Sequence, residues 1–200
     1  MKYIIMCAGK GIRWNNYLGV PKHLIEINGE TLLGRTTRIL KEHNIDYIIT
    51  GNDERYAKYG KLIPQSKNDC EVDRFEEMTE EVCYLYGDVY YTDEALETII
   101  NTPVKDILFF GSMVEIFAIK VKDKNKFYHH KNKVKKLYLN KKIDRCIGWE
   151  VYRSMHGIPF NEHHITERYV LIEDDTDDID YPEDYVAFIK KRSDNKWVTQ

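Results

Sequence analysis

The stretch Tyr3-Ile4-Ile5-Met6-Cys7-Ala8-Gly9-Lys10-Gly11-Ile12-Arg13, followed by Pro21-Lys22, decides how the rest of the chain is interpreted. A short apolar run that ends in a glycine turn predicts a buried strand over 3–7. The two glycines allow a tight bend whose N–H groups point into one concavity, and such a nest binds phosphate. Lys10, Arg13 and Lys22 add three cations around it. Glycine is also common in strand-to-helix turns without a ligand, so Gly-x-Gly alone establishes no site.

The residues after the turn exclude two nucleotide-binding motifs. A dinucleotide fingerprint needs a third glycine where this chain has Trp14, and a P-loop needs a Gly-Lys-Ser/Thr sequence that is missing. The remaining pattern is Gly-x-Gly-x-Arg and, eight residues later, Pro-Lys. This combination resembles the signature of the nucleotidyltransferases that activate sugar 1-phosphates, phosphocholine and molybdopterin.

The resemblance implies a role for each matching residue. The loop formed by Ala8, Gly9, Lys10 and Gly11 is expected to hold an NTP. Arg13 would meet its β- and γ-phosphates, and Lys22 would meet the reacting phosphates.

Composition bounds the type of protein. Two hundred residues with 42% hydrophobic residues predict one globular domain, 1–200. No stretch approaches the roughly 20 apolar residues that cross a bilayer, and the N-terminal apolar run is too short for a signal peptide. We therefore expect a cytoplasmic protein without membrane contact. The four scattered cysteines form no Cys-x-x-Cys pair, which argues against a zinc site or a disulfide framework.

Charge is unevenly distributed although the net charge is only −3. The stretch 120–142 holds ten lysines and a single acidic residue, whereas 173–184 holds eight acidic residues and no basic one. We interpret the lysine-rich stretch as solvated surface and do not expect nucleic-acid binding, because it lacks arginine and the whole chain is acidic. The segment 122–142 has no readable pattern and is a candidate small insertion.

Short β-like runs alternate with amphipathic segments, which predicts an α/β fold: a three-layer α/β/α sandwich with a mostly parallel mixed sheet. Thr31 is expected to cap a helix that carries Leu32, Leu33, Ile39 and Leu40 at helical spacing. The predicted strands are 3–7, 24–27, 46–50, 82–86, 106–110, 114–121 and 168–173. Further helices are predicted near 70–80, 93–101, 144–155 and 182–191.

Three carboxylates are candidates for a metal site. Asp88 follows a strand that ends in Gly-Asp, and ligands of open α/β sheets bind beyond the carboxyl ends of the strands. Asp178 and Asp180 would share one side of an extended segment, because strand side chains alternate. The resemblance assigns all three to Mg²⁺, an ion that prefers such oxygens together with substrate phosphates. A turn at Asp88 and an acidic helix start after Asp180 are the structural alternatives.

The resemblance also implies the reaction and its partners. A small phosphorylated substrate, a sugar 1-phosphate or an alcohol such as phosphocholine, would attack an NTP, take its NMP and release pyrophosphate. Asn68 lies roughly where that family reads the nucleobase, but the usual Gly-Thr-Ala helix start is absent. The base, the phosphorylated substrate and the formation of a homodimer stay open.

Two alternatives remain. A GT-A glycosyltransferase would use a nucleotide sugar and the same sheet, but Tyr90 stands where its Asp-x-Asp motif needs a second aspartate. A non-catalytic nucleotide-binding protein would keep the glycine loop without needing Lys22 or three separated carboxylates.

Overall fold

The first strand shows how the sheet divides the core. In β1 (Lys2–Met6) and the residue after it, Tyr3, Ile5 and Cys7 face one side of the sheet, and Ile4 and Met6 face the other. This alternation is the normal consequence of strand geometry. Both faces are apolar, as expected of a parallel strand with helices on either side.

The computed structural model describes residues 1–195. Its seven-stranded sheet has the order β10-β8-β9-β6-β1-β4-β5, and the other sheets are two-stranded ribbons. All neighbouring pairs of the large sheet are parallel except those that involve β9, which runs antiparallel to β6 and β8. The predicted mostly parallel mixed sheet is confirmed. Its strands are β1, β4 (Tyr47–Thr50), β5 (Leu62–Ile63), β6 (Val82–Tyr86), β8 (Ile107–Gly111), β9 (Ile116–Val121) and β10 (Tyr169–Leu171).

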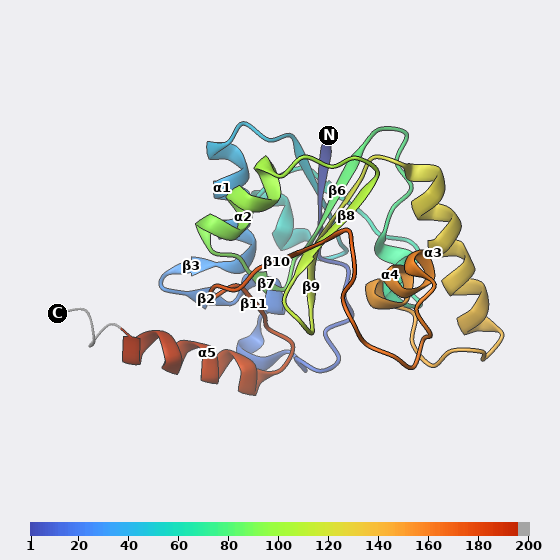
Figure 1. Ribbon diagram of the computed structural model, residues 1–200. Helices are drawn as coiled ribbons and strands as arrows, with labels where there is room; N and C mark the ends of the chain where they lie inside the picture. Colours follow the sequence, from blue (N-terminus) through green and yellow to red (C-terminus); the bar gives the residue numbers. More distant parts are fainter. Residues whose placement is uncertain (196–200) are drawn as a thin grey trace.

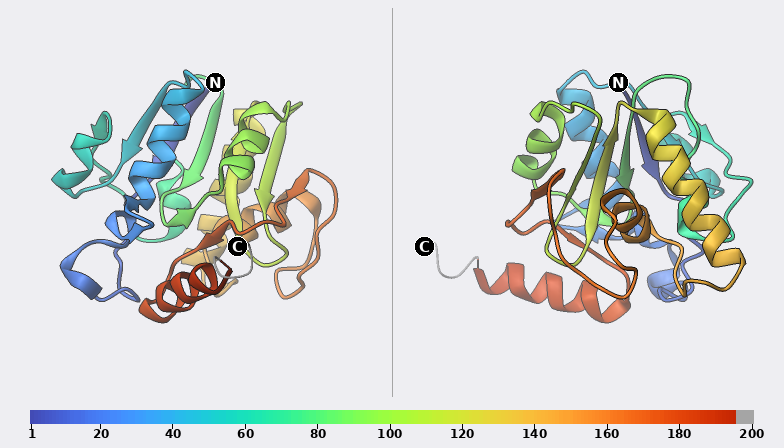
Figure 2. Two further views of the ribbon diagram at one scale, coloured as in Figure 1. Left: turned by 90° about the vertical axis from the view of Figure 1, so that its left-hand side faces the viewer. Right: turned by 45° about the vertical axis from the view of Figure 1, so that its right-hand side comes forward.

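Helices cover both faces of the sheet, so the predicted three layers are present. Figures 1 and 2 show α1 (Leu32–Glu42) and α2 (Asp93–Asn101) on one face, and α3 (Lys124–Leu139) and α4 (Gly148–His156) on the other. Thr31 caps α1 as predicted, with its hydroxyl accepting a hydrogen bond from Gly34 N. No helix among the described residues is long and apolar enough to cross a membrane.

The segment 122–142, which had no readable pattern, contains α3. This helix buries Phe127, Val134 and Lys131; among its lysines, Lys133 and Lys136 are exposed. Its apolar stripe is narrow, which explains why the sequence pattern was weak.

The helix predicted over 70–80 is wrong. Only one turn of 3-10 helix forms there, η4 (Glu71–Arg74). The backbone after it bonds to distant side chains instead of to itself: the Glu76 carbonyl accepts from the Tyr84 hydroxyl, and Tyr128 Oη accepts from Met78 N at 2.7 Å. Tertiary partners therefore replace the helical hydrogen bonds.

A small third core lies outside the sheet. The C-terminal helix α5 (Pro182–Asn195) packs Phe188 against Tyr90 and contributes to a cluster with Trp14, Ile25 and Ile179. Three short strands accompany it: β2 (Glu26–Ile27) and β3 (Glu30–Thr31) form a hairpin, and β7 (Val89–Tyr90) pairs with β11 (Asp177–Asp178).

Candidate active site

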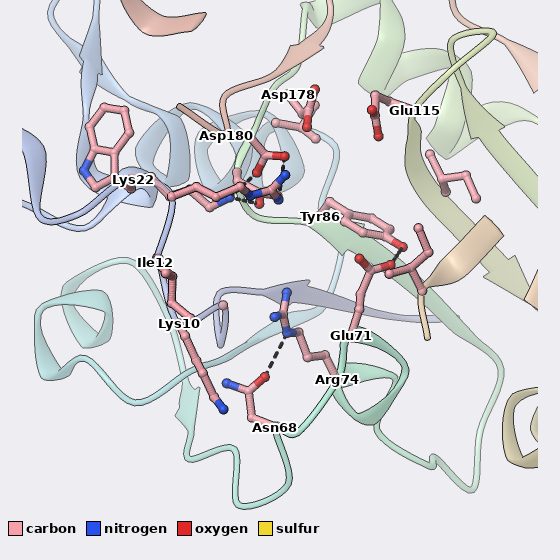
Figure 3. A pocket seen from close by; sticks show the side chains of 18 of the residues that line it. Lys10, Ile12, Lys22, Asn68, Glu71, Arg74, Tyr86, Glu115, Asp178 and Asp180 are labelled. Carbon is pink, nitrogen blue, oxygen red and sulfur yellow. Dashed lines mark hydrogen bonds and ion pairs between the residues drawn. The ribbon is translucent and has the colours of Figure 1, made fainter. Parts of the chain in front are cut away.

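A cavity of about 570 Å³ opens where β1 and β6 end. It is lined by every residue predicted for the site except Ala8, and Figure 3 shows several of these side chains converging on it. The Ala8 carbonyl accepts a hydrogen bond from Asn68 Nδ2. The lining residues predicted from sequence are Gly9, Lys10, Gly11, Arg13, Lys22, Asn68, Asp88, Asp178 and Asp180.

The glycine loop is shaped by residues in left-handed conformation. Gly11 has φ +60°, and the turn is closed by a 2.9 Å hydrogen bond from Asn15 N to the Gly11 carbonyl. Asn15 and Asn16 continue with positive φ, which asparagine tolerates better than most residues. Trp14 is buried, and its Nε1 donates to the Val20 carbonyl at 2.8 Å. The residue that breaks the dinucleotide fingerprint is thus the anchor of this loop.

Lys22 is the centre of the charge network. After the extended Pro21 it begins a 3-10 turn, η2 (Lys22–Leu24), and its side chain is buried. Its ammonium forms ion pairs with Asp88 and, at 2.8 Å, with Asp180. Arg13 Nη2 reaches the other oxygen of Asp180 at 2.6 Å.

These contacts fix the protonation of Lys22 and Asp88. Burial alone would lower the pKa of Lys22, but Asp88 and Asp180 raise it above its usual value. Burial alone would raise the pKa of Asp88, but the Lys22 ammonium lowers it to about 2. The pair is therefore charged at neutral pH.

Gly87 explains why the strand ends in Gly-Asp. A Cβ on this residue would lie 2.5 Å from Cys7 Sγ and 2.7 Å from the Met6 carbonyl oxygen. Only glycine allows the chain to pass so close to the end of β1. This close passage leads directly into Asp88 beside Lys22.

Asp178 reaches the same pocket through a ribbon that the sequence did not reveal. The shared assignment to Mg²⁺ requires Asp88 and Asp178 to lie close together. The antiparallel pairing of β11 with β7 brings Asp178 opposite Val89, and Ile179 N donates to the Asp88 carbonyl at 3.0 Å. Backbone pairing holds the two acidic segments together.

Glu115 is a further carboxylate in the pocket, and no feature of the sequence predicts it. It lies just before β9, lines the pocket, and belongs to no recognisable motif. Burial, and then the negative charge of Asp180, raise its pKa to about 7. Burial, followed by Glu115, Asp180 and Asp88, raises the pKa of Asp178 to about 8. Both raised values reflect burial first, and then repulsion between the carboxylates that share this part of the pocket.

No three His, Cys, Asp or Glu side chains of residues 1–192 form a ready-made metal cluster. Asp88 and Asp180 hold the ammonium of Lys22 between them, and Asp178 shares only the pocket. The magnesium assignment of these three residues stays a prediction.

The other side of the pocket contains polar groups from the region of the wrongly predicted helix. Glu71 Oε1 accepts hydrogen bonds from the Tyr86 hydroxyl at 2.6 Å and from Gly148 N at 2.8 Å. Arg74 Nε donates to Asn68 Oδ1 at 3.0 Å. Neither Glu71 nor Arg74 was predicted, because both depend on a turn whose shape is set by distant partners.

Comparison with known proteins gives the fold but no close relative. No family model and no curated protein matches the sequence. Among solved structures, CTP:phosphocholine cytidylyltransferase from Streptococcus pneumoniae is similar with a TM-score of 0.61 and 16% identity, covering 94% of this chain and 97% of that one.

Two other enzymes match over nearly the full chain. UDP-glucose pyrophosphorylase, solved with UDP-glucose, has a TM-score of 0.62 and 10% identity, with 97% of this chain and 98% of that one covered. The inositol-1-phosphate CTP transferase from T. maritima has a TM-score of 0.58 and 12% identity, with 95% of each chain covered. At these identities the likeness shows a common fold, which is the fold that the resemblance in the sequence implied.

Proposed function

We propose that this protein is a magnesium-dependent nucleotidyltransferase that transfers an NMP from an NTP to a small phosphorylated substrate. An oxygen of the substrate phosphate attacks the α-phosphorus of the NTP. The bond between that phosphorus and the bridging oxygen to the β-phosphate breaks, and pyrophosphate leaves with the electron pair. The fold shared with three enzymes of this kind supports the proposal.

The observation that carries the proposal is the network of Lys22, Asp88 and Asp180 beside the glycine loop. A buried ammonium with a raised pKa remains charged, so it can stabilise negative charge that develops on the phosphates. Arg13 supplies a second cation next to it. Phosphoryl transfer depends mainly on positioning and on such positive charge.

The residues of the pocket fit magnesium. Mg²⁺ is held by one or two carboxylates together with substrate phosphates, and Asp88, Asp178 and Asp180 offer such oxygens. The raised pKa values of Asp178 and Glu115 reflect burial and uncompensated negative charge that a cation would relieve. When bound, Mg²⁺ would neutralise charge on the triphosphate.

Tyr90 argues against the glycosyltransferase alternative. It occupies the second position of the expected Asp-x-Asp, and its ring is buried against Phe188 at a centroid distance of 4.9 Å. A buried aromatic ring cannot supply that motif's second metal ligand.

The test is pyrophosphate release from ATP, CTP, GTP and UTP in the presence of Mg²⁺ and a panel of phosphorylated sugars and alcohols. Lys22→Ala should lower kcat by roughly 10²–10³, the scale of losing one transition-state donor, and Asp88→Asn should abolish turnover. The control is Asp175→Asn, because Asp175 is an acidic residue outside the pocket that pairs with Lys191 at 2.9 Å.

Thermal unfolding of each variant checks that the fold survives. Release of pyrophosphate with none of the substrates would contradict the proposal. Normal turnover of a folded Lys22→Ala or Asp88→Asn protein would contradict the assigned roles.

A further inference from the structure

The feature that the proposed chemistry leaves unexplained is the guanidinium of Arg74. Its Nε donates to Asn68 Oδ1, and Asn68 Nδ2 in turn donates to the Ala8 carbonyl. A Cβ on Gly9 would lie 3.5 Å from Arg74 Nη1, so the guanidinium rests against the glycine loop. Both polar ends of the Asn68 amide are used to hold it there.

Among residues 1–192 Arg74 has no ion pair, and its Nη1 and Nη2 have no hydrogen-bond acceptor there. The other arginines of the pocket are neutralised: Arg13 by Asp180 and Arg145 by Glu150 at 3.2 Å. Arg74 is half-buried, whereas Lys10, which also has no ion pair among the described residues, is exposed. A half-buried guanidinium aligned through Nε leaves two parallel N–H donors for a ligand.

The position of Arg74 indicates which part of a nucleotide it meets. Figure 3 shows Asn68 and Arg74 on one side of the pocket, and Lys22 with Asp180 on the other. Under the proposed function, on which this inference rests, the phosphates lie with Lys22 and Arg13. The nucleoside then extends toward Ala8 and Gly9, where Arg74 is held.

We propose that Arg74 is the residue that selects the nucleobase, and that it selects cytosine or guanine. A planar fork of two donors matches a planar edge with two adjacent acceptors. Guanine offers O6 and N7, and cytosine offers O2 and N3. Uracil has N3–H between its two carbonyl oxygens, and adenine has an amine beside each of its candidate acceptors N1 and N7, so neither provides this edge. Asn68, predicted to read the base, is then a positioning residue for Arg74.

The experiment measures the affinities of ATP, CTP, GTP and UTP for the whole protein and for three variants by isothermal titration calorimetry. The wild type should bind CTP or GTP at least about tenfold more tightly than ATP and UTP. Arg74→Ala should weaken the preferred nucleotide by roughly 10- to 100-fold, the scale of one bidentate base contact. The affinities for the other nucleotides should stay nearly unchanged, so that the protein no longer discriminates between bases.

Asn68→Ala should reduce the same discrimination, because the fork loses its alignment. Arg55→Ala is the matched control: Arg55 pairs with Asp53 through a similar Nε contact at 2.9 Å but does not line the pocket. A change that disturbs the fold would weaken the binding of all four nucleotides. The ratio of their affinities therefore separates base selection from a merely structural role.

Each contrary result has a distinct meaning. Equal loss of affinity for all four nucleotides in Arg74→Ala would overturn base selection, because both a lost phosphate contact and a disturbed fold act on every nucleotide alike. A wild-type preference for ATP or UTP, or one that Arg74→Ala preserves, would overturn it while leaving the proposed function intact. Binding of no nucleotide by the wild type would overturn both.

Discussion

At the scale of single residues, His23 links the charge network around Lys22 to stability in acid. Its ring is buried, and its Nδ1 lies 2.8 Å from the Tyr56 hydroxyl oxygen. Burial lowers its pKa from 6.5 to about 4, and the nearby charges of Lys22 and Arg74 act in the same direction, while Asp88 opposes them. The native protein therefore holds His23 neutral in a pH range where the unfolded chain protonates it.

This difference in protonation sets the sign of the pH effect. Between about pH 6.5 and 4 the unfolded state binds more protons at His23, so the free energy of unfolding should fall as the pH falls. The contribution is at most about 3 kcal/mol for a shift of this size. Asp178 and Glu115, whose pKa values are raised, act in the opposite direction because the native state retains their protons as the pH rises.

The contribution of His23 is therefore measured as a difference. Urea unfolding at pH 7.5 and 4.5 should show a smaller loss of stability on acidification for His23→Gln than for the wild type. The exposed His129 provides the control, since His129→Gln should retain the wild-type loss. An unchanged loss in His23→Gln would show that His23 is not the group that titrates.

At the scale of elements, helix α5 stabilises the two chain segments that the ion pair between Arg13 and Asp180 connects. Asp180 lies just before this helix and binds Arg13, and Arg13 precedes the buried Trp14. Tyr185 of α5 packs edge-on against Trp14 with ring centroids 6.2 Å apart, and its hydroxyl donates to the Glu26 carbonyl at 3.0 Å. The helix thus fastens the end of the glycine loop and the acidic segment to one small core.

Removing the Phe188 side chain from that core should destabilise the protein. Phe188 is buried, and Phe188→Ala should lower the free energy of unfolding by about 3 kcal/mol. It should also weaken nucleotide binding, because Trp14 and Ile179 lose their packing partner. Val186, on the same helix and 55% exposed, is the control: Val186→Ala should change stability by about 0.5 kcal/mol or less. Equal effects of the two substitutions in urea titrations would show that α5 is not anchored in this way.

At the scale of the whole molecule, the sequence predicted what local signals determine. The helix predicted near 93–101 has those bounds and is capped by Thr92. The mostly parallel sheet follows from the alternation of apolar runs and amphipathic segments. The segment 70–80 could not be predicted, because tyrosines from β6 and α3 satisfy its backbone.

The residues of the site likewise fall into those that a sequence motif predicts and those that no motif predicts. Lys22 and Asp88 stand in recognisable motifs, and both line the pocket. Glu115 and Arg74 carry no motif, and they reach the pocket only because a hairpin and an irregular turn are folded against it. The ribbon of β7 and β11, which joins segments far apart in the chain, likewise has too few residues to leave a pattern.

The Lys22 ammonium competes with a metal ion for the same carboxylate oxygens. The ammonium forms ion pairs with Asp88 and Asp180, two of the three carboxylates proposed to bind Mg²⁺. A divalent ion that arrives alone must displace an internal counter-ion, whereas phosphates that attract Lys22 and Arg13 would release those oxygens. Metal and nucleotide should therefore bind cooperatively, with a coupling free energy that works in both directions.

This competition predicts that removing the Lys22 ammonium strengthens the binding of free metal. Lys22→Ala should bind Mg²⁺ alone more tightly than the wild type, by about tenfold or more, although it loses turnover. Lys10→Ala removes a charge from the same pocket without breaking an ion pair, and it should gain little. Calorimetric titration with MgCl₂ distinguishes the cases, and equal affinities in all three proteins would refute the competition. If the competition holds, the protein without nucleotide resists free metal, and a bound phosphate is what makes its carboxylates available.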